Sequence, residues 1–145
     1  MESFSLPRKI LVAVDGSDGS VAAGRYAIEL ALMTKAELFV LNVIQIPEYV
    51  SVDVRSRLER ELRSRGDVAL AKVREAAGSK HIVVKENIRT TTKSVVTTIC
   101  DEAAIDHAGL VVLGNNGAGG MAQLMLGSVA AGVVREAACP VLVVR

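Results

Sequence analysis

The chain has 145 residues, a formal charge of +1, and hydrophobic side chains at half of its positions. This length fits one domain, so we expect residues 1–145 to fold as a single unit. A near-neutral chain produces no long-range field that would attract nucleic acid or an acidic membrane surface. Cys100 and Cys139 have no metal-binding or redox spacing, and Met1–Pro7 lacks the pattern of a signal peptide. No apolar stretch reaches membrane-spanning length, so we expect a cytoplasmic protein.

Short apolar runs alternate with segments whose apolar residues recur every three or four positions. The runs predict strands and the spaced segments predict amphipathic helices. In chain order we predict a strand at Ile10–Val14, a helix at Ser20–Thr34, a strand at Leu38–Val43, a helix at Asp53–Ala77, a strand at Ile82–Val84 with its flanks, a helix at Thr92–Ala104, a strand at Leu110–Leu113, a helix at Ser128–Ala138 and a strand at Val141–Val144.

Most of these strands are continuously apolar, which is typical of a parallel sheet that is covered on both faces. Alternating strands and helices predict βαβ units with right-handed crossovers, and hence an α/β fold of three layers. The arginines between Arg55 and Arg65 are mixed with Glu59 and Glu61, which favours a solvated helix face. Gln45–Ser51 is predicted to be irregular, either as a lid or as a plain connection.

A glycine-rich segment, Gly114–Ser128, follows the fourth predicted strand and leads into the last helix. Glycines let a backbone approach an anion closely, and the first turn of a helix offers free N–H groups and a positive dipole end. Together these features predict a phosphate site, to which Ser128 could add a hydroxyl donor. Two structural alternatives stay open: Ser128 could be a plain helix N-cap, and Gly127 could simply permit a tight entry to the helix.

Asp15 ends the first predicted strand, where ligands of open α/β sheets bind if the strand order reverses at that point. If the first and fourth strands are neighbours, Asp15 and Gly114 line one crevice, and the carboxylate can accept hydrogen bonds from ribose hydroxyls. The alternative is a turn-forming Asp before Gly16, with Ser17 or Asp18 capping the next helix.

The spacing Gly114-x2-Gly117-x9-Gly127-Ser128 resembles the nucleotide-binding motif of universal stress proteins. The opening Ile10-Leu-Val-Ala-Val-Asp15-Gly-Ser and the proline-led ending Ala138-Cys-Pro140-Val-Leu-Val-Val resemble that family too. The resemblance covers nearly the whole chain. It implies a five-stranded parallel sheet in the order 3-2-1-4-5, a Rossmann-like fold of the adenine nucleotide alpha hydrolase kind.

The resemblance also implies ATP, or ADP or AMP, in the crevice. The end of the first strand would contact ribose or adenine, the second strand would give adenine a backbone contact, and the glycine segment would hold ribose and phosphates. The residues that match these family positions are Ala13, Val14 and Asp15; Val43; Leu113, Gly114, Asn116 and Gly117; and Gly127, Ser128 and Val129.

The chain departs from many relatives where they place His or Arg, because Asn115 and Asn116 stand there and no Lys or Arg occurs from Gly114 to Ser128. Helix N–H groups, a distant side chain, or Mg²⁺ or Mn²⁺ held through the phosphates would then have to balance the phosphate charge. No catalytic residue and no protein metal site are predicted.

Three interpretations of function follow from these residues. The first is a nucleotide-dependent regulatory module of the stress response, and the retained glycines favour it. The second is a dimeric interaction protein without nucleotide, and the third is a slow ATPase, although no base or arginine finger is evident. The apolar strand Val141–Val144 predicts a homodimer, because pairing with a second copy would cover an exposed sheet edge.

Overall fold

A computed structural model describes residues 5–116 and 125–145 of the chain, so Gly117 lies outside the described residues. The elements are β1 (Lys9–Ala13), α1 (Asp18–Thr34), β2 (Glu37–Gln45), α2 (Val52–Gly78), β3 (Val84–Thr91), α3 (Val95–Ile105), β4 (Leu110–Gly114), α4 (Ser128–Glu136) and β5 (Val141–Val144).

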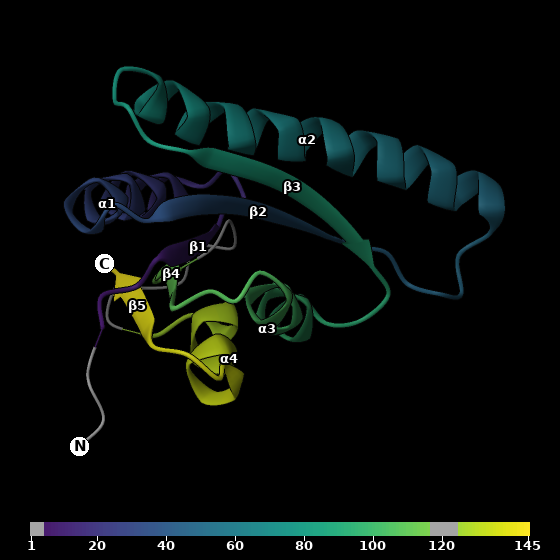
Figure 1. The fold of residues 1–145 in the computed structure, drawn as a ribbon. Helices are drawn as coiled ribbons and strands as arrows, with labels where there is room; N and C mark the ends of the chain where they lie inside the picture. Colours follow the sequence, from purple (N-terminus) through teal and green to yellow (C-terminus); the bar gives the residue numbers. More distant parts are fainter. Residues whose placement is uncertain (1–4, 117–124) are drawn as a thin grey trace.

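The strands form one parallel sheet in the order β3-β2-β1-β4-β5, which confirms the predicted order and fold class. Helices α1 and α2 cover one face of the sheet, and α3 and α4 cover the other (Figure 1). The strand order reverses between β1 and β4. The helix that follows β1 therefore covers one face of the sheet, and the helix that follows β4 covers the other face.

Each face of the sheet has its own apolar core. Ile10 and Val12 point toward α1 and α2, whereas Leu11 and Val111 point toward α3 and α4. Because both faces are covered, consecutive residues of the central strands are all buried, and this is why those strands read as continuous apolar runs.

The third strand lies further along the chain than its apolar run predicts. The prediction centred on Ile82–Val84, but β3 spans Val84–Thr91 at the edge of the sheet. Val84 and Ile88 pack against the core under α2, while Lys85 and Arg89 are exposed on the other face. An edge strand covered on one face alternates apolar and polar residues, so a continuous apolar run is the wrong signal for it.

Serines set the starts of three helices. The hydroxyls of Ser17, Ser51 and Ser94 accept hydrogen bonds from backbone N–H groups in the first turns of α1, α2 and α3. The third helix therefore begins at Val95, rather than at Thr92 as predicted.

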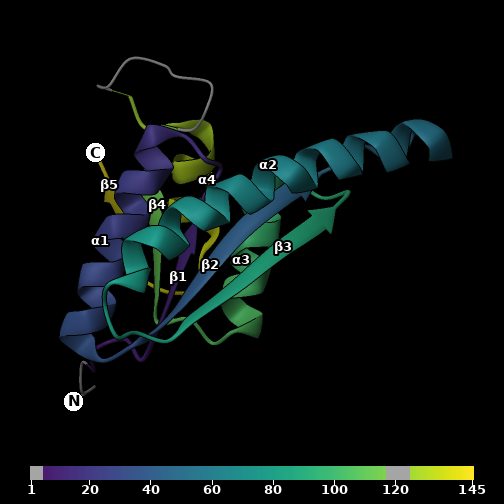
Figure 2. The ribbon, with the colours of Figure 1, turned by 90° about the horizontal axis from the view of Figure 1, so that it is seen from above.

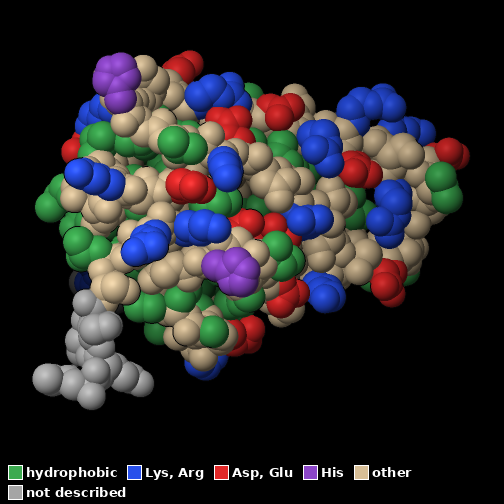
Figure 3. Space-filling model, viewed as in Figure 1, with side chains coloured by type: hydrophobic (Ala, Val, Ile, Leu, Met, Phe, Trp, Pro, Cys, Tyr) green, Lys and Arg blue, Asp and Glu red, His purple; other side chains and the backbone are tan. Residues whose placement is uncertain are grey.

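Helix α2 is the longest element, and its N-terminal part extends beyond the other helices together with the ends of β2 and β3 (Figure 2). Arg63 and Arg65 each pair with the glutamate one turn earlier, Glu59 and Glu61. Basic and acidic side chains are mixed over the face seen in Figure 3. This mixture agrees with a solvated helix face.

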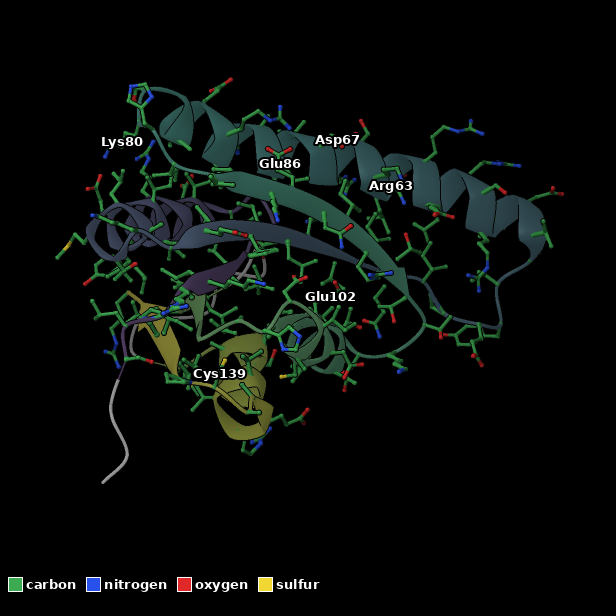
Figure 4. All side chains as sticks on the ribbon, in the orientation of Figure 1. Arg63, Asp67, Lys80, Glu86, Glu102 and Cys139 are labelled. Carbon is green, nitrogen blue, oxygen red and sulfur yellow. The ribbon has the colours of Figure 1, made fainter. Side chains whose placement is uncertain are left out.

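A buried carboxylate ties α3 to the edge strand. Glu102 lies between α3 and β3 (Figure 4), is 5% exposed, and forms an ion pair with Arg89, whose Nε lies 2.7 Å from Oε1. One turn later, at the end of α3, burial and the neighbouring Glu102 raise the pKa of Asp106, against the opposing effect of Lys9, Arg89 and Lys85. Ionised Asp106 is therefore less favourable in the folded chain than in the unfolded chain.

The pKa shift of Asp106 predicts a pH-dependent gain of stability in the Asp106→Asn variant. Because folding raises this pKa, the folded chain holds more protons than the unfolded chain just above pH 3.8, and stability falls as pH rises through that window. We expect the variant to melt at a higher temperature than wild type at pH 7, and this difference to shrink below pH 3.8 in thermal melts. Asp101→Asn, on the exposed side of the same helix, is the control. If the melting temperature of Asp106→Asn exceeded that of wild type by more as the pH fell, the raised pKa of Asp106 would be contradicted.

Candidate functional site

A cleft of about 360 Å³ opens at the carboxyl ends of β1, β2 and β4, where the strand order reverses. A cleft of this size falls in the range of small-molecule sites. Its lining residues are Ala13, Val14, Asp15, Ser20, Leu41, Asn42, Val43, Val95, Ile99, Leu113, Gly114, Asn115, Asn116, Gly127, Ser128, Val129 and Ala130.

The cleft brings together the candidate residues from all three strand ends and from the start of α4. Gly117 is the exception, because it lies outside the described residues. Sequence reasoning did not select the other lining side chains: Ser20, Leu41, Asn42, Val95, Ile99, Asn115 and Ala130. Val95 and Ile99 belong to the apolar face of a predicted helix, so no sequence signal separated them from ordinary core residues.

The turn after β1 is held by hydrogen bonds from its own neighbourhood. Asp15 Oδ1 accepts the N–H of Ser17 at 2.9 Å, and Gly16 adopts φ +88°, a conformation that other residues rarely take. The buried Ser20 Oγ accepts the N–H groups of Asp15 and Gly16, both at 3.2 Å. Asp15 thus shapes the turn and also lines the cleft, while its contact with ribose stays a prediction.

Gly114 lets the end of β4 lie against the first turn of α1. A Cβ atom at Gly114 would meet the backbone carbon and oxygen of Gly19 at 2.8 Å. Because these atoms belong to the backbone, a side chain could enter only if the strand and the helix moved apart. Gly114 therefore serves close packing between two elements that border the cleft.

Helix α4 begins at Ser128, as predicted, and the alternative in which Ser128 is a plain N-cap is wrong. The N-cap is Gly127, not Ser128, which is the first helical residue, and no side chain caps this helix. Gly127 donates its N–H to the carbonyl of Asn115 at 2.9 Å, and a Cβ at Gly127 would lie 2.5 Å from that oxygen. Gly127 thus permits a close approach of the two ends of the segment. Helix geometry leaves the N–H groups of Ser128, Val129 and Ala130 without intrahelical acceptors beside the cleft.

The described lining of the cleft contains one charged side chain, Asp15, and no Lys or Arg. Across the described parts of the chain, no three His, Cys, Asp or Glu residues are grouped so that they could hold a metal ion. The two cysteines are free, and burial is the main cause that raises the pKa of both Cys100 and Cys139. Both therefore favour the thiol over the nucleophilic thiolate.

A sequence model of the universal stress protein family matches residues 7–145. The chain belongs to this family. A universal stress protein of Methanocaldococcus jannaschii is 33% identical over 144 residues, which cover 97% of this chain and 84% of the relative. Another, YxiE of Bacillus subtilis, is 32% identical over 94% of this chain and 98% of its own length.

The fold also matches solved members of the universal stress protein family. UspA of Lactobacillus plantarum has a TM-score of 0.83 and 28% identity, with 99% of this chain and 100% of that chain covered.

Within the described residues, no helix is both long and apolar enough to span a membrane.

The backbone contact at Gly114 predicts a specific packing penalty. We expect Gly114→Ala to lower the free energy of unfolding by roughly 1–3 kcal/mol, the usual cost of forcing extra volume into a packed site. The matched control is Gly78→Ala at the end of α2, where an added Cβ meets nothing within 4 Å. The control should be neutral or slightly more stable in urea unfolding. Equal stability of the two variants would argue against close packing between β4 and α1.

Proposed function

We propose that this universal stress protein binds an adenine nucleotide, ATP or its di- or monophosphate, and acts as a nucleotide-dependent regulatory module of the stress response. The observation that carries the proposal is the convergence of three features on one cleft: the first turn of α4, the Asp15 turn and the end of β2. These features offer donors for phosphates, an acceptor for ribose hydroxyls and a backbone edge for a base.

The phosphates are assigned to the first turn of α4. The N–H groups of Ser128, Val129 and Ala130 and the positive end of the helix dipole attract anions there. Ser128 is exposed and its hydroxyl caps no helix, so it remains available to a phosphate oxygen. Gly127 has no side chain, so its backbone could lie close to a phosphate. Its N–H would not bind that phosphate, because it already donates to the carbonyl of Asn115. Gly117 belongs to the same proposal on the resemblance alone.

The base and ribose are assigned to the opposite end of the cleft. Leu41, Val43, Val95 and Ile99 are apolar residues of the lining and would form the walls for a purine ring, and the Asp15 carboxylate would face the ribose. Members of the family with the same fold have been solved in complex with cAMP, dAMP and AMP, at TM-scores of 0.70, 0.70 and 0.68. These complexes support an adenine nucleotide as the ligand class here.

Mg²⁺ or Mn²⁺ would be held mainly by the phosphates, because Asp15 is the one carboxylate among the described lining residues. The described lining also lacks a histidine or a cation that could activate water or stabilise charge at a γ-phosphate. Binding rather than turnover is therefore the function that this lining supports.

A charge placed in the first turn of α4 should separate binding from folding. In Val129→Asp the new carboxylate interacts favourably with the positive end of the helix dipole, so the fold should survive. The same carboxylate repels the phosphates of a bound nucleotide. We expect ATP affinity to fall at least about tenfold in calorimetry with Mg²⁺, since nearby like charges cost on the order of 1–4 kcal/mol near a protein surface. Val129→Asn is the matched neutral control, and it should keep most of the affinity.

Wild-type protein should also release an adenine nucleotide when it is freshly purified and denatured, as identified by chromatography. The proposal is wrong if wild type neither releases a nucleotide nor binds added ATP, ADP or AMP. Unchanged affinity in Val129→Asp would overturn the assignment of the phosphates to α4.

We further propose a homodimer that pairs β5 with its copy. Strand β5 lies at the sheet edge, and Val111 N–H and Asn115 N–H donate to the carbonyls of Pro140 and Val144. Even-numbered residues of β5 thus face β4, so the backbone groups of Val141 and Val143 point outward. The other edge strand, β3, exposes Lys85, Glu86, Asn87 and Arg89, charged and polar side chains that oppose strand pairing.

Proline at position 143 should separate the two copies without breaking the sheet of each. Val143→Pro removes an outward N–H and leaves the hydrogen bonds between β4 and β5 in place, as prolines in natural edge strands do. We expect wild type and Val143→Thr to sediment as dimers and Val143→Pro to sediment as a monomer. A dimer that persists in the proline variant would place the interface elsewhere.

A further inference from the structure

Strand β2 directs its backbone groups alternately to its two neighbours. Glu37 N–H donates to Arg8 O, and Leu41 O accepts from Val14 N–H, so odd-numbered residues face β1. Leu38 N–H and Ile46 N–H donate to Val83 O and Thr91 O, so even-numbered residues face β3. The N–H and C=O of Val43 therefore point to the β1 side.

On that side, β1 has already ended. Its last paired residue is Ala13, opposite Leu41. If the parallel ladder continued by one step, Val43 N–H would donate to Val14 O. Instead, Val14 O accepts a hydrogen bond from the side chain of Asn42, through Nδ2 at 2.8 Å. A side-chain amide thus takes the place of the next backbone donor, and Val43 faces the cleft that it lines.

The position of Asn42 is set by α2. Asn42 is 7% exposed, and its Oδ1 points at Gly66, where an added Cβ would lie only 2.4 Å from that oxygen. Asn42 Oδ1 has no hydrogen-bond partner among the described residues. A buried acceptor without a partner lowers stability, so packing alone does not account for an asparagine at this place.

We propose that Asn42 is a positioning residue, which holds the Val14 carbonyl and thereby keeps the N–H and C=O of Val43 open to the base of the bound nucleotide. This inference rests on the proposed function. One residue that offers a donor and an acceptor side by side matches the N1 acceptor and N6 amino donor of adenine. Hypoxanthine presents the reverse pattern, with a donor at N1 and an acceptor at O6.

The first test needs no nucleotide. In Asn42→Leu the side chain keeps its approximate size but cannot donate, so Val43 N–H should close onto Val14 O. We would follow hydrogen exchange of the nucleotide-free protein by NMR. The Val43 amide should exchange about tenfold more slowly in the variant than in wild type, because one hydrogen bond contributes about the free energy of a tenfold change. Because the new bond satisfies Val14 O, the variant should remain folded.

The second test measures base selectivity by calorimetry with ATP and ITP. Wild type should prefer ATP by about tenfold or more, because ITP would leave the Val43 groups mismatched. In Asn42→Leu, ATP affinity should fall and the ratio of the two affinities should approach one. A general loss of stability would weaken both ligands alike and leave the ratio unchanged.

Two further variants complete the experiment. Gly66→Ala should displace Asn42 through its Cβ and reproduce both effects, and it replaces Asn42→Leu if that variant fails to fold. Thr34→Val, which removes a side-chain hydrogen bond to Leu30 O far from the cleft, should behave as wild type. Unchanged Val43 exchange and an unchanged ATP-to-ITP ratio in the variants would overturn the role of Asn42. A wild type that binds no nucleotide would instead overturn the proposed function, while the exchange experiment would still decide the role of Asn42.

Discussion

Close backbone packing of the end of β4 against the starts of α1 and α4 is the constraint on which the cleft depends. Strands β1 and β4 lie side by side, and the chain leaves them toward opposite faces of the sheet. Gly114 then allows the end of β4 to touch the first turn of α1, and Gly127 allows the start of α4 to touch Asn115. These contacts place the starts of two helices around one opening, where backbone N–H groups face a shared space.

Hydrogen bonds from three elements hold the turn after β1, and the described lining of the cleft carries little charge. Ser20 binds the turn from α1, Asn42 binds it from β2, and Lys72 Nζ donates to Gly16 O from α2 at 3.0 Å. Such preorganisation reduces the ordering cost of binding. Because the described lining has no cation, selectivity for a ligand must come from directed backbone groups rather than from net charge.

Helix α2 links the proposed site to the rest of the surface. The same helix contacts the Asp15 turn through Ala69 and Lys72, and contacts Asn42 through Gly66. Its N-terminal part then projects past the sheet (Figure 2). Through these contacts, α2 connects the turn beside the cleft with an exposed part of the molecule.

The sequence by itself determined the element order and the parallel sheet, because buried strands and amphipathic helix faces are local patterns. The strand order and most of the lining residues came from the resemblance to the family, and the structure then confirmed that order. Only the tertiary structure decided the place of β3, the N-cap at Gly127 and the roles of Ser20 and Asn42. An edge strand loses the apolar run that marks a central strand, and Asn115 reaches Gly127 only in the folded chain. Asn42 sits within an apolar strand, and it contacts Val14 and Gly66, which are distant in sequence and adjacent in space.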